Sequence, residues 1–134
     1  MNKSIKVIAS IIEKDNTYLI AQRPAHKWEG GLWEFPGGKT EPGETDQECL
    51  KRELFEEFNI QVEVGDYCCS HSFEYKDNTI ELHAYHVTTF TGELQPTEHQ
   101  DIRWVNVSEL SDYKFPEPDY VIIDNIKKRG CDNS

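Results

Sequence analysis

Three glutamates are spaced so that any helix containing them carries them on one face. Glu53, Glu56 and Glu57 stand at positions i, i+3 and i+4, and at about 100° per residue their side chains fall within an arc of about 100°. Like charges this close cost an isolated helix roughly a few tenths of a kcal/mol for each pair. Two interpretations are open: a solvated acidic face with Lys51 and Arg52 as local partners, or a site for a hard divalent cation such as Mg²⁺, with waters that a phosphate substrate displaces.

The sequence predicts a helix over residues 46–58 that would hold these carboxylates in place. Thr45 and Glu48 fit a capping box, with a hydroxyl at the N-cap and a carboxylate three residues later. Asn59 follows where a left-handed residue commonly ends a helix. Apolar residues recur every four positions and predict the buried stripe: Leu50, Leu54 and Phe58.

Most of the remaining chain is rich in strand-forming residues separated by turn signals. Residues 5–12 and 17–22 predict a hairpin, residues 32–35 a short strand, and Pro36-Gly37-Gly38 a sharp turn. Further strands are expected over 60–64, 67–75, 79–90 and 101–106, a short helical turn over 107–110 and a closing helix over 120–129. This order predicts an α+β fold with a mixed sheet between helices, as a single domain over residues 1–130 with a short tail over 131–134.

Composition narrows the classes of function. The chain has 134 residues with 14 Lys+Arg against 25 Asp+Glu, a net charge of −11, which disfavours binding to a nucleic-acid polymer. An anionic small molecule remains compatible if a divalent cation inverts the local field. The sequence shows neither a membrane-length apolar run nor a signal peptide, so we expect a cytoplasmic protein without a membrane partner. Its four cysteines are expected to be free thiols: Cys49, Cys68, Cys69 and Cys131.

The glutamates belong to a longer pattern between Gly38 and Ile60. That segment reads G-x5-E-x7-R-E-U-x-E-E-x-N-U, with U an aliphatic residue. It resembles the Nudix box, the 23-residue loop-helix-loop of the Nudix hydrolases, at every defining position except Asn59, which stands where the family has Gly. Because Asn tolerates the left-handed conformation, we expect this departure to affect stability slightly and chemistry little.

The resemblance extends over nearly the whole chain and is closest to the MutT-like branch, which includes CTP pyrophosphohydrolases and 8-oxo-dGTP diphosphatases. The similar segments are residues 21–24, 31–39, 98–100 ahead of Trp104, and 115–119. The fold it implies is an α/β/α sandwich. The activity it implies is metal-assisted attack of water on a nucleoside triphosphate, giving a nucleoside monophosphate and pyrophosphate.

The resemblance also implies which residues hold the metal, expected to be Mg²⁺ with Mn²⁺ as a substitute. Glu53 and Glu57 are implied as principal ligands and Glu56 as a third, with a backbone carbonyl of Gly37 or Gly38 completing the site. Glu98 matches a position where MutT-like enzymes bring in an extra ligand or base.

Two further residues of the box have roles of a supporting kind. The guanidinium of Arg52 is expected to hold a box carboxylate in place. Glu44 is either a water-mediated ligand or the holder of Arg52. The proton of the attacking water would pass to Glu53, Glu56 or Glu98, a choice that the sequence leaves open.

Base recognition is expected away from the box. Asp119 matches a position where relatives place Asn or Asp on the base edge; it equally fits a cap of the last helix. An ionised Asp119 would accept from cytosine N4, whereas a protonated one could also donate, which keeps oxidised guanine open. The other candidate substrate-binding residues are Arg23, Glu34, Phe35, Pro36, Gly37, Gly38, Lys39, His71 and Phe73; His99 is a further candidate for the pocket lining.

Several of these residues have simpler interpretations. Arg23 could be a surface residue at a strand end, and Phe35 and Phe73 could stack on a base or pack in the core. The expected partner is a nucleoside triphosphate, and the protein a monomer or a homodimer. The alternatives are another Nudix substrate, such as a nucleotide sugar or dinucleoside polyphosphate, and a sensor module that binds nucleotides without turnover.

Overall fold

A computed structural model describes residues 3–27, 30–97 and 99–132. Two helices and a short 3₁₀ helix accompany the strands. The elements in chain order are β1 (Ser4–Lys14), β2 (Thr17–Gln22), β3 (Trp33–Glu34), β4 (Gly37–Lys39), α1 (Asp46–Phe58), β5 (Gln61–Tyr75), β6 (Asn78–Thr91), β7 (Asp101–Val105), the 3₁₀ helix η1 (Val107–Asp112) and α2 (Asp119–Asp132).

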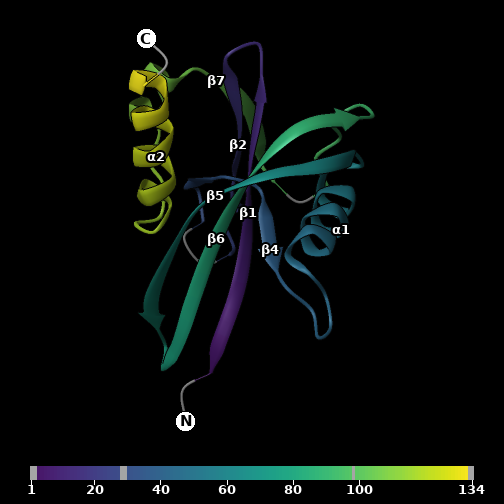
Figure 1. The fold of residues 1–134 in the computed structure, drawn as a ribbon, viewed down its shortest axis with the longest axis vertical. Helices are drawn as coiled ribbons and strands as arrows, with labels where there is room; N and C mark the ends of the chain where they lie inside the picture. Colours follow the sequence, from purple (N-terminus) through teal and green to yellow (C-terminus); the bar gives the residue numbers. More distant parts are fainter. Residues whose placement is uncertain (1–2, 28–29, 98, 133–134) are drawn as a thin grey trace.

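The strands form one mixed sheet in which β1 is the central element (Figure 1). β1 pairs in parallel with β6 over nine positions, from Ser4↔Thr79 to Ile12↔Val87. Antiparallel pairing joins β1 to β4 and, at its far end, to β2, while β6 pairs with β5 and β2 pairs with both β3 and β7. The sheet therefore brings β4, which precedes α1, directly against the middle of β1.

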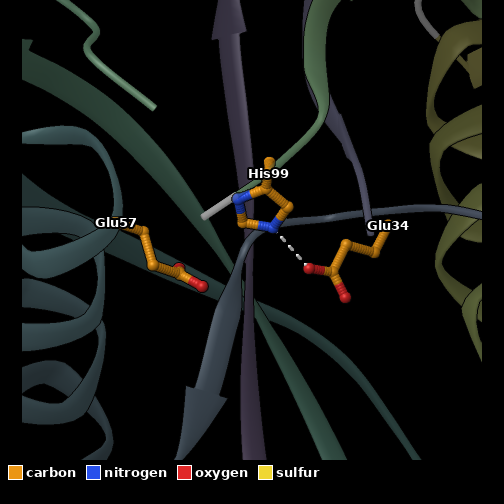
Figure 2. Close-up of side chains that lie close together, drawn as sticks. All are labelled: Glu34, Glu57 and His99. Carbon is orange, nitrogen blue, oxygen red and sulfur yellow. Dashed lines mark hydrogen bonds and ion pairs between the residues drawn. The ribbon is translucent and has the colours of Figure 1, made fainter. Parts of the chain in front are cut away.

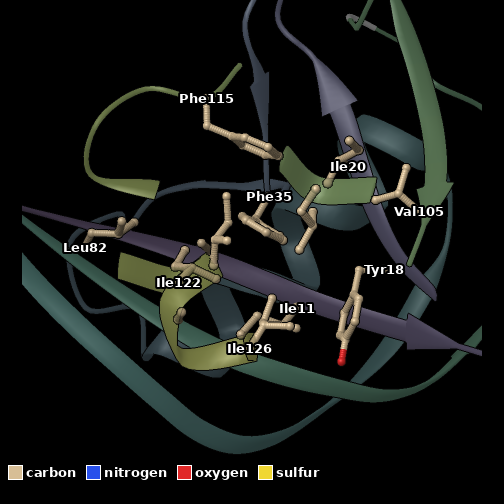
Figure 3. Close-up of a cluster of buried hydrophobic side chains, with 13 residues drawn as sticks. Ile11, Tyr18, Ile20, Phe35, Leu82, Val105, Phe115, Ile122 and Ile126 are labelled. Carbon is tan, nitrogen blue, oxygen red and sulfur yellow. The ribbon is translucent and has the colours of Figure 1, made fainter. Parts of the chain in front are cut away.

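The two helices lie on opposite sides of the sheet (Figure 1). On the α2 side, Ile122 and Ile126 pack with Ile11, Ile20 and other buried apolar side chains in one cluster (Figure 3). On the α1 side, Leu54 and Phe58 pack with Ile12, Leu19 and Val87. This arrangement confirms the expected α+β fold with helices on both faces of a mixed sheet. No helix among the described residues is long and apolar enough to cross a membrane.

Helix α1 has the predicted boundaries and caps. The Thr45 hydroxyl accepts from the Glu48 backbone N–H, and the Glu48 carboxylate accepts from the Thr45 backbone N–H, so both halves of the capping box are present. Asn59 adopts φ 58° and ψ 37° and ends the helix in the left-handed region. The predicted stripe of Leu50, Leu54 and Phe58 is fully buried. Local sequence therefore fixes the element that carries the three glutamates.

Three local predictions were incomplete or wrong. Gly37-Gly38 does not form a turn: together with Lys39 it forms β4, where the register Ile8↔Gly38 places it against β1. Residues 61–75 form a single strand with register shifts between Glu63 and Cys69, not two separate strands. The predicted hairpin pairs only at Glu13↔Tyr18 and Lys14↔Thr17, and further along β1 the residues Val7–Ala9 pair with β4 instead.

Helix α2 begins one residue before the predicted start and runs to Asp132, past the point where the sequence suggested a tail. Among the cysteines, Cys49, Cys68 and Cys69 are free thiols, as expected.

Candidate active site

A cleft of about 450 Å³ runs between α1 and the start of α2. Its floor comes from β1, including Val7, Ile8 and Ala9. One end, which we call the carboxylate end, is lined by Glu53, Glu57 and the glycines of β4. The other, which we call the polar end, is lined by Arg23, Glu34, Phe73, His99 and Asp119. The two groups of side chains meet at Glu57, whose carboxylate lies within 4.8 Å of ligand atoms of Glu34 and His99.

The three glutamates of α1 do not occupy equivalent positions. Glu53 and Glu57 line the cleft, one helical turn apart. Glu57 is only 9% exposed, whereas the side chain of Glu56 is 56% exposed and contacts Arg52 at 3.5 Å. The helix therefore presents two carboxylates to the cleft, whereas the third is exposed and outside the cleft lining.

Arg52 organises the carboxylate end. Its Nε donates to Glu44 Oε2 at 2.7 Å and its Nη2 to Glu44 Oε1 at 2.9 Å, in a two-pronged ion pair. Its Nη1 donates to Glu53 Oε1 at 2.9 Å, and Nη2 also donates to the Lys39 carbonyl at 3.0 Å. The bonds from Arg52, followed by one from the Glu41 backbone N–H, lower the pKa of Glu44 to about 2. The bond to Glu44 in turn raises the pKa of Arg52. One guanidinium thus holds Glu44, Glu53 and the end of β4 together.

The glycines of β4 let two backbones and a carboxylate meet. A Cβ on Gly38 would lie 2.4 Å from the carboxyl carbon of Glu53, and a Cβ on Gly37 would lie 1.8 Å from the Ile8 carbonyl oxygen. Glu53 is therefore pressed against the backbone of β4, where burial raises its pKa despite the bond from Arg52. Pro36, which precedes β4, is held by the buried Ser10, whose Oγ (2.7 Å) and N (2.8 Å) both donate to the Pro36 carbonyl.

This arrangement fits a hard divalent cation. Two carboxylates, Glu53 and Glu57, face the same end of the cleft, and the β4 backbone passes directly beside one of them. Oxygen donors from carboxylates and carbonyls are the ligands such cations prefer. A cation held there would stabilise the ionised form of the half-buried Glu53, which Arg52 offsets only in part.

At the polar end, Asp119 is the first residue of α2 and its carboxyl accepts from the backbone N–H of Phe35. Burial, followed by the nearby Glu34 carboxylate, raises the pKa of Asp119 to about 7, against the opposing effects of the Phe35 bond and of Arg23. Both protonation states of this carboxyl are thus accessible near neutral pH.

Glu34 is the most tightly held side chain at the polar end. Its Oε1 pairs with Arg23 Nη1 at 2.5 Å, and its Oε2 with His99 Nε2 at 2.7 Å (Figure 2). The imidazole lies between Glu34 and Glu57, which reaches toward it from α1 (Figure 2). Ligand atoms of these three residues lie within 4.8 Å of one another. The short His99–Glu34 contact is accounted for by a hydrogen bond.

The other predicted substrate-binding residues divide into those at the cleft and those away from it. Phe35 lines the cleft from within the core, where it is stacked on Phe115 with ring centroids 5.5 Å apart. Phe73 is half-buried and lines the cleft, and the exposed Lys39 lies at its edge. His71 is exposed and stacks on Phe73 outside the lining. Glu98 lies outside the described residues.

Comparison with known proteins shows the family to which the chain belongs. The NUDIX domain model matches residues 7–125. The chain therefore belongs to the Nudix family, as its box predicted, and is a hydrolase of that family.

Individual relatives show which Nudix proteins the chain is similar to. The chain is 45% identical to the CTP pyrophosphohydrolase of Escherichia coli over 122 residues, 91% of this chain and 90% of that protein. It is 40% identical to the 8-oxo-dGTP diphosphatase of Proteus vulgaris over 93 residues, 69% of this chain and 83% of the relative. The solution structure of the E. coli ORF135 protein superposes with a TM-score of 0.87 at 43% identity, covering 95% of this chain and 91% of that one.

Proposed function

We propose that this protein hydrolyses nucleoside triphosphates to a nucleoside monophosphate and pyrophosphate, with Mg²⁺ as its metal and Mn²⁺ as a substitute. The observation that carries the proposal is the cleft between α1 and α2, in which two metal-compatible carboxylates and a group of aromatic and hydrogen-bonding side chains line one space. A triphosphate at the carboxylate end would leave its base at the polar end. The names of the relatives support this class of substrate.

Glu53 and Glu57 would hold the metal, with the backbone carbonyl of Gly37 or Gly38. Glu56, which is exposed, and Glu98 are the further candidate ligands. When bound, the metal neutralises phosphate charge and lowers the pKa of a coordinated water. The steps assigned to the chain itself are positioning, charge compensation and proton transfer.

Arg52 has the positioning role, because it fixes the Glu53 carboxylate and the end of β4 in one arrangement. Its paired bonds with Glu44 favour the interpretation of Glu44 as the holder of Arg52. Lys39 at the cleft edge would offset phosphate charge. Glu53, Glu56 or Glu98 would accept the proton of the attacking water.

The base would lie between Phe73 and Asp119. An ionised Asp119 accepts from an exocyclic amino group such as cytosine N4, and a protonated one can donate to a carbonyl. We therefore propose cytosine nucleotides and oxidised nucleotides such as 8-oxo-dGTP as substrates, with cytosine favoured by the higher identity to a CTP pyrophosphohydrolase. Such an activity removes surplus or damaged nucleotides from the cytoplasmic pool, and the net charge of −11 favours free nucleotides over polymers.

The test is release of pyrophosphate and phosphate over a panel of normal, 5-substituted and 8-oxo nucleoside triphosphates, with Mg²⁺ and after chelation. We expect pyrophosphate, not phosphate, from a few bases only, and none after chelation. Hydrolysis of nucleotide sugars or dinucleoside polyphosphates without triphosphate turnover would overturn the substrate assignment. Binding without turnover of any nucleotide would favour a sensor.

The same panel tests the role of Asp119. Asp119→Ala should change the ratio of turnover between bases, and so their ranking, by about tenfold, the effect of one charge-assisted hydrogen bond. The Mg²⁺ requirement should stay unchanged. An unchanged ranking would assign Asp119 to structure at the start of α2.

A further inference from the structure

His99 is buried at a position that the catalytic assignments leave unused. Its side chain is 3% exposed, and its Nε2 lies 2.7 Å from Glu34 Oε2. In the tautomer that carries its hydrogen on Nε2, His99 donates to this carboxylate oxygen. The ring also stacks on Phe58, with centroids 5.2 Å apart and planes 9° from parallel. His99 is thus fixed by a hydrogen bond at one side and by a buried aromatic face at the other.

The loop that carries His99 is anchored on both sides of it. Before His99, the backbone N–H of Gln95 donates to the Phe58 carbonyl and that of Thr97 to the Glu57 carbonyl, both at 2.9 Å. After it, Gln100 donates to the carbonyls of Gln22 and Arg23, each at 3.0 Å. The loop therefore joins the C-terminal end of α1, where Glu57 stands, to the strand end that carries Arg23.

The two oxygens of Glu34 are held from different directions. Arg23 binds Oε1 and His99 binds Oε2, so the carboxylate plane has one orientation in the cleft, close to Asp119. Without His99, rotation of the Glu34 carboxylate toward the Arg23 guanidinium would satisfy both oxygens there. The groups presented to a base at the polar end would then change although Glu34 itself is intact.

Resting on the proposed function, we propose that His99 is a positioning residue that sets discrimination between bases. Its Nε2–H orients the Glu34 carboxylate, and its ring ties that carboxylate to the end of α1. His99 acts through Glu34, without contacting the phosphates or the metal. Loss of its hydrogen bond should therefore weaken selection among bases more than turnover.

The test compares two amides of different length at this position. The amide nitrogen of His99→Gln extends far enough to replace Nε2–H, whereas that of His99→Asn is one methylene shorter and does not reach Glu34. For His99→Asn and His99→Ala we expect the ratio of kcat/KM between the preferred and a rejected base to fall about tenfold, chiefly through KM. The Mg²⁺ concentration for half-maximal activity should stay within about twofold, and His99→Gln should recover most of the ratio. His83→Asn, on β6 outside the cleft lining, is the matched control.

A double-mutant cycle shows whether His99 acts through Glu34. In a Glu34→Gln background, His99→Asn should have no further effect on the base ratio. Additive effects, an equal loss for all bases, or a shifted Mg²⁺ requirement would each overturn the proposal, the last by making His99 a metal ligand. If His99→Ala does not fold, judged by thermal unfolding, the Gln and Asn pair decides.

Failure of the proposed function gives a different result. If the wild-type protein hydrolyses no nucleoside triphosphate, that function is wrong, and equilibrium binding of CTP and 8-oxo-dGTP with Ca²⁺ replaces the kinetic ratio. Wild-type discrimination that His99→Asn reduces about tenfold would still support the positioning role. Equal binding by the two proteins, or no binding by either, would overturn it.

Discussion

The two ends of the cleft are built in opposite ways. The carboxylate end comes from residues 37–57, a continuous segment in which β4, a loop and α1 follow one another. The polar end combines Arg23, Glu34, His99 and Asp119, whose positions span most of the chain. The first is therefore specified by local spacing, and the second only by the folded sheet.

Their electrostatics differ as well. At the carboxylate end, Arg52 is bound to both Glu44 and Glu53, and the pKa of Glu44 is lowered to about 2. At the polar end, burial and Glu34 raise the pKa of Asp119 to about 7. Thus the carboxylate end contains a permanently ionised support, whereas the polar end contains a group that changes charge near neutral pH. Under the proposed function, the first would serve the phosphates and the second the choice of base.

The largest effect is expected at the carboxylate end. Glu57→Gln keeps the size of a 9% exposed side chain but removes its charge, so turnover should fall by at least about 100-fold with the fold intact. Pyrophosphate release and thermal unfolding measure the two quantities. Glu63→Gln, an exposed position on β5, is the control and should match the wild-type protein. Activity within a few-fold of wild type for Glu57→Gln would mean that the metal assignment is wrong.

The neighbouring glycines offer a sharper separation of site from fold. In Gly38→Ala the new methyl group meets the carboxylate of Glu53, a side chain that can move aside. We expect activity to fall roughly 10- to 100-fold while the melting temperature changes by only a few degrees. In Gly37→Ala the methyl group meets the Ile8 backbone within the β1–β4 pairing, so stability should fall first. Equal changes of activity and stability in the two variants would mean that Gly38 serves the sheet and not the carboxylate.

The sequence predicted the carboxylate end well because its information is local. A capping box, a four-residue apolar repeat and an Asn in the left-handed region define α1 within fifteen residues. Helical geometry then places Glu53 and Glu57 on one face. The exposure of Glu56 did not follow from that spacing, because a shared arc of 100° does not say which of the three side chains faces the cleft.

The polar end and β4 show what local reasoning misses. The glycines at 37 and 38 suggested a turn, but pairing with β1 draws them into a strand, an outcome that depends on Ala9 and Ile8, 28 and 30 positions earlier. His99 was only one of several histidine candidates, since the Glu34 that binds it is 65 residues away. The cue available in the sequence was the Glu98-His99-Gln100 segment. Its role could not be inferred without knowing that the β6–β7 loop lies against α1.

The smallest effect expected is a dependence of stability on pH that arises at the polar end. The pKa of Asp119 rises from 3.8 to about 7 on folding, through burial and then the Glu34 carboxylate. Between these values the folded protein retains a proton that the unfolded chain has released. The free energy of unfolding should therefore fall as pH rises from about 4 to about 7 and level off above it.

Asp119→Asn removes this contribution. Relative to the wild-type protein, the variant should therefore become more stable as pH rises, by roughly 1–3 kcal/mol over that window. Urea unfolding at pH 5, 6, 7 and 8 measures the difference, with Asp124→Asn on the exposed side of α2 as the control. Because all other titrating groups are shared, only the difference between the two profiles reports Asp119. Parallel profiles would show that its carboxyl stays ionised in the folded protein, and the polar end would then be as fixed in charge as the carboxylate end.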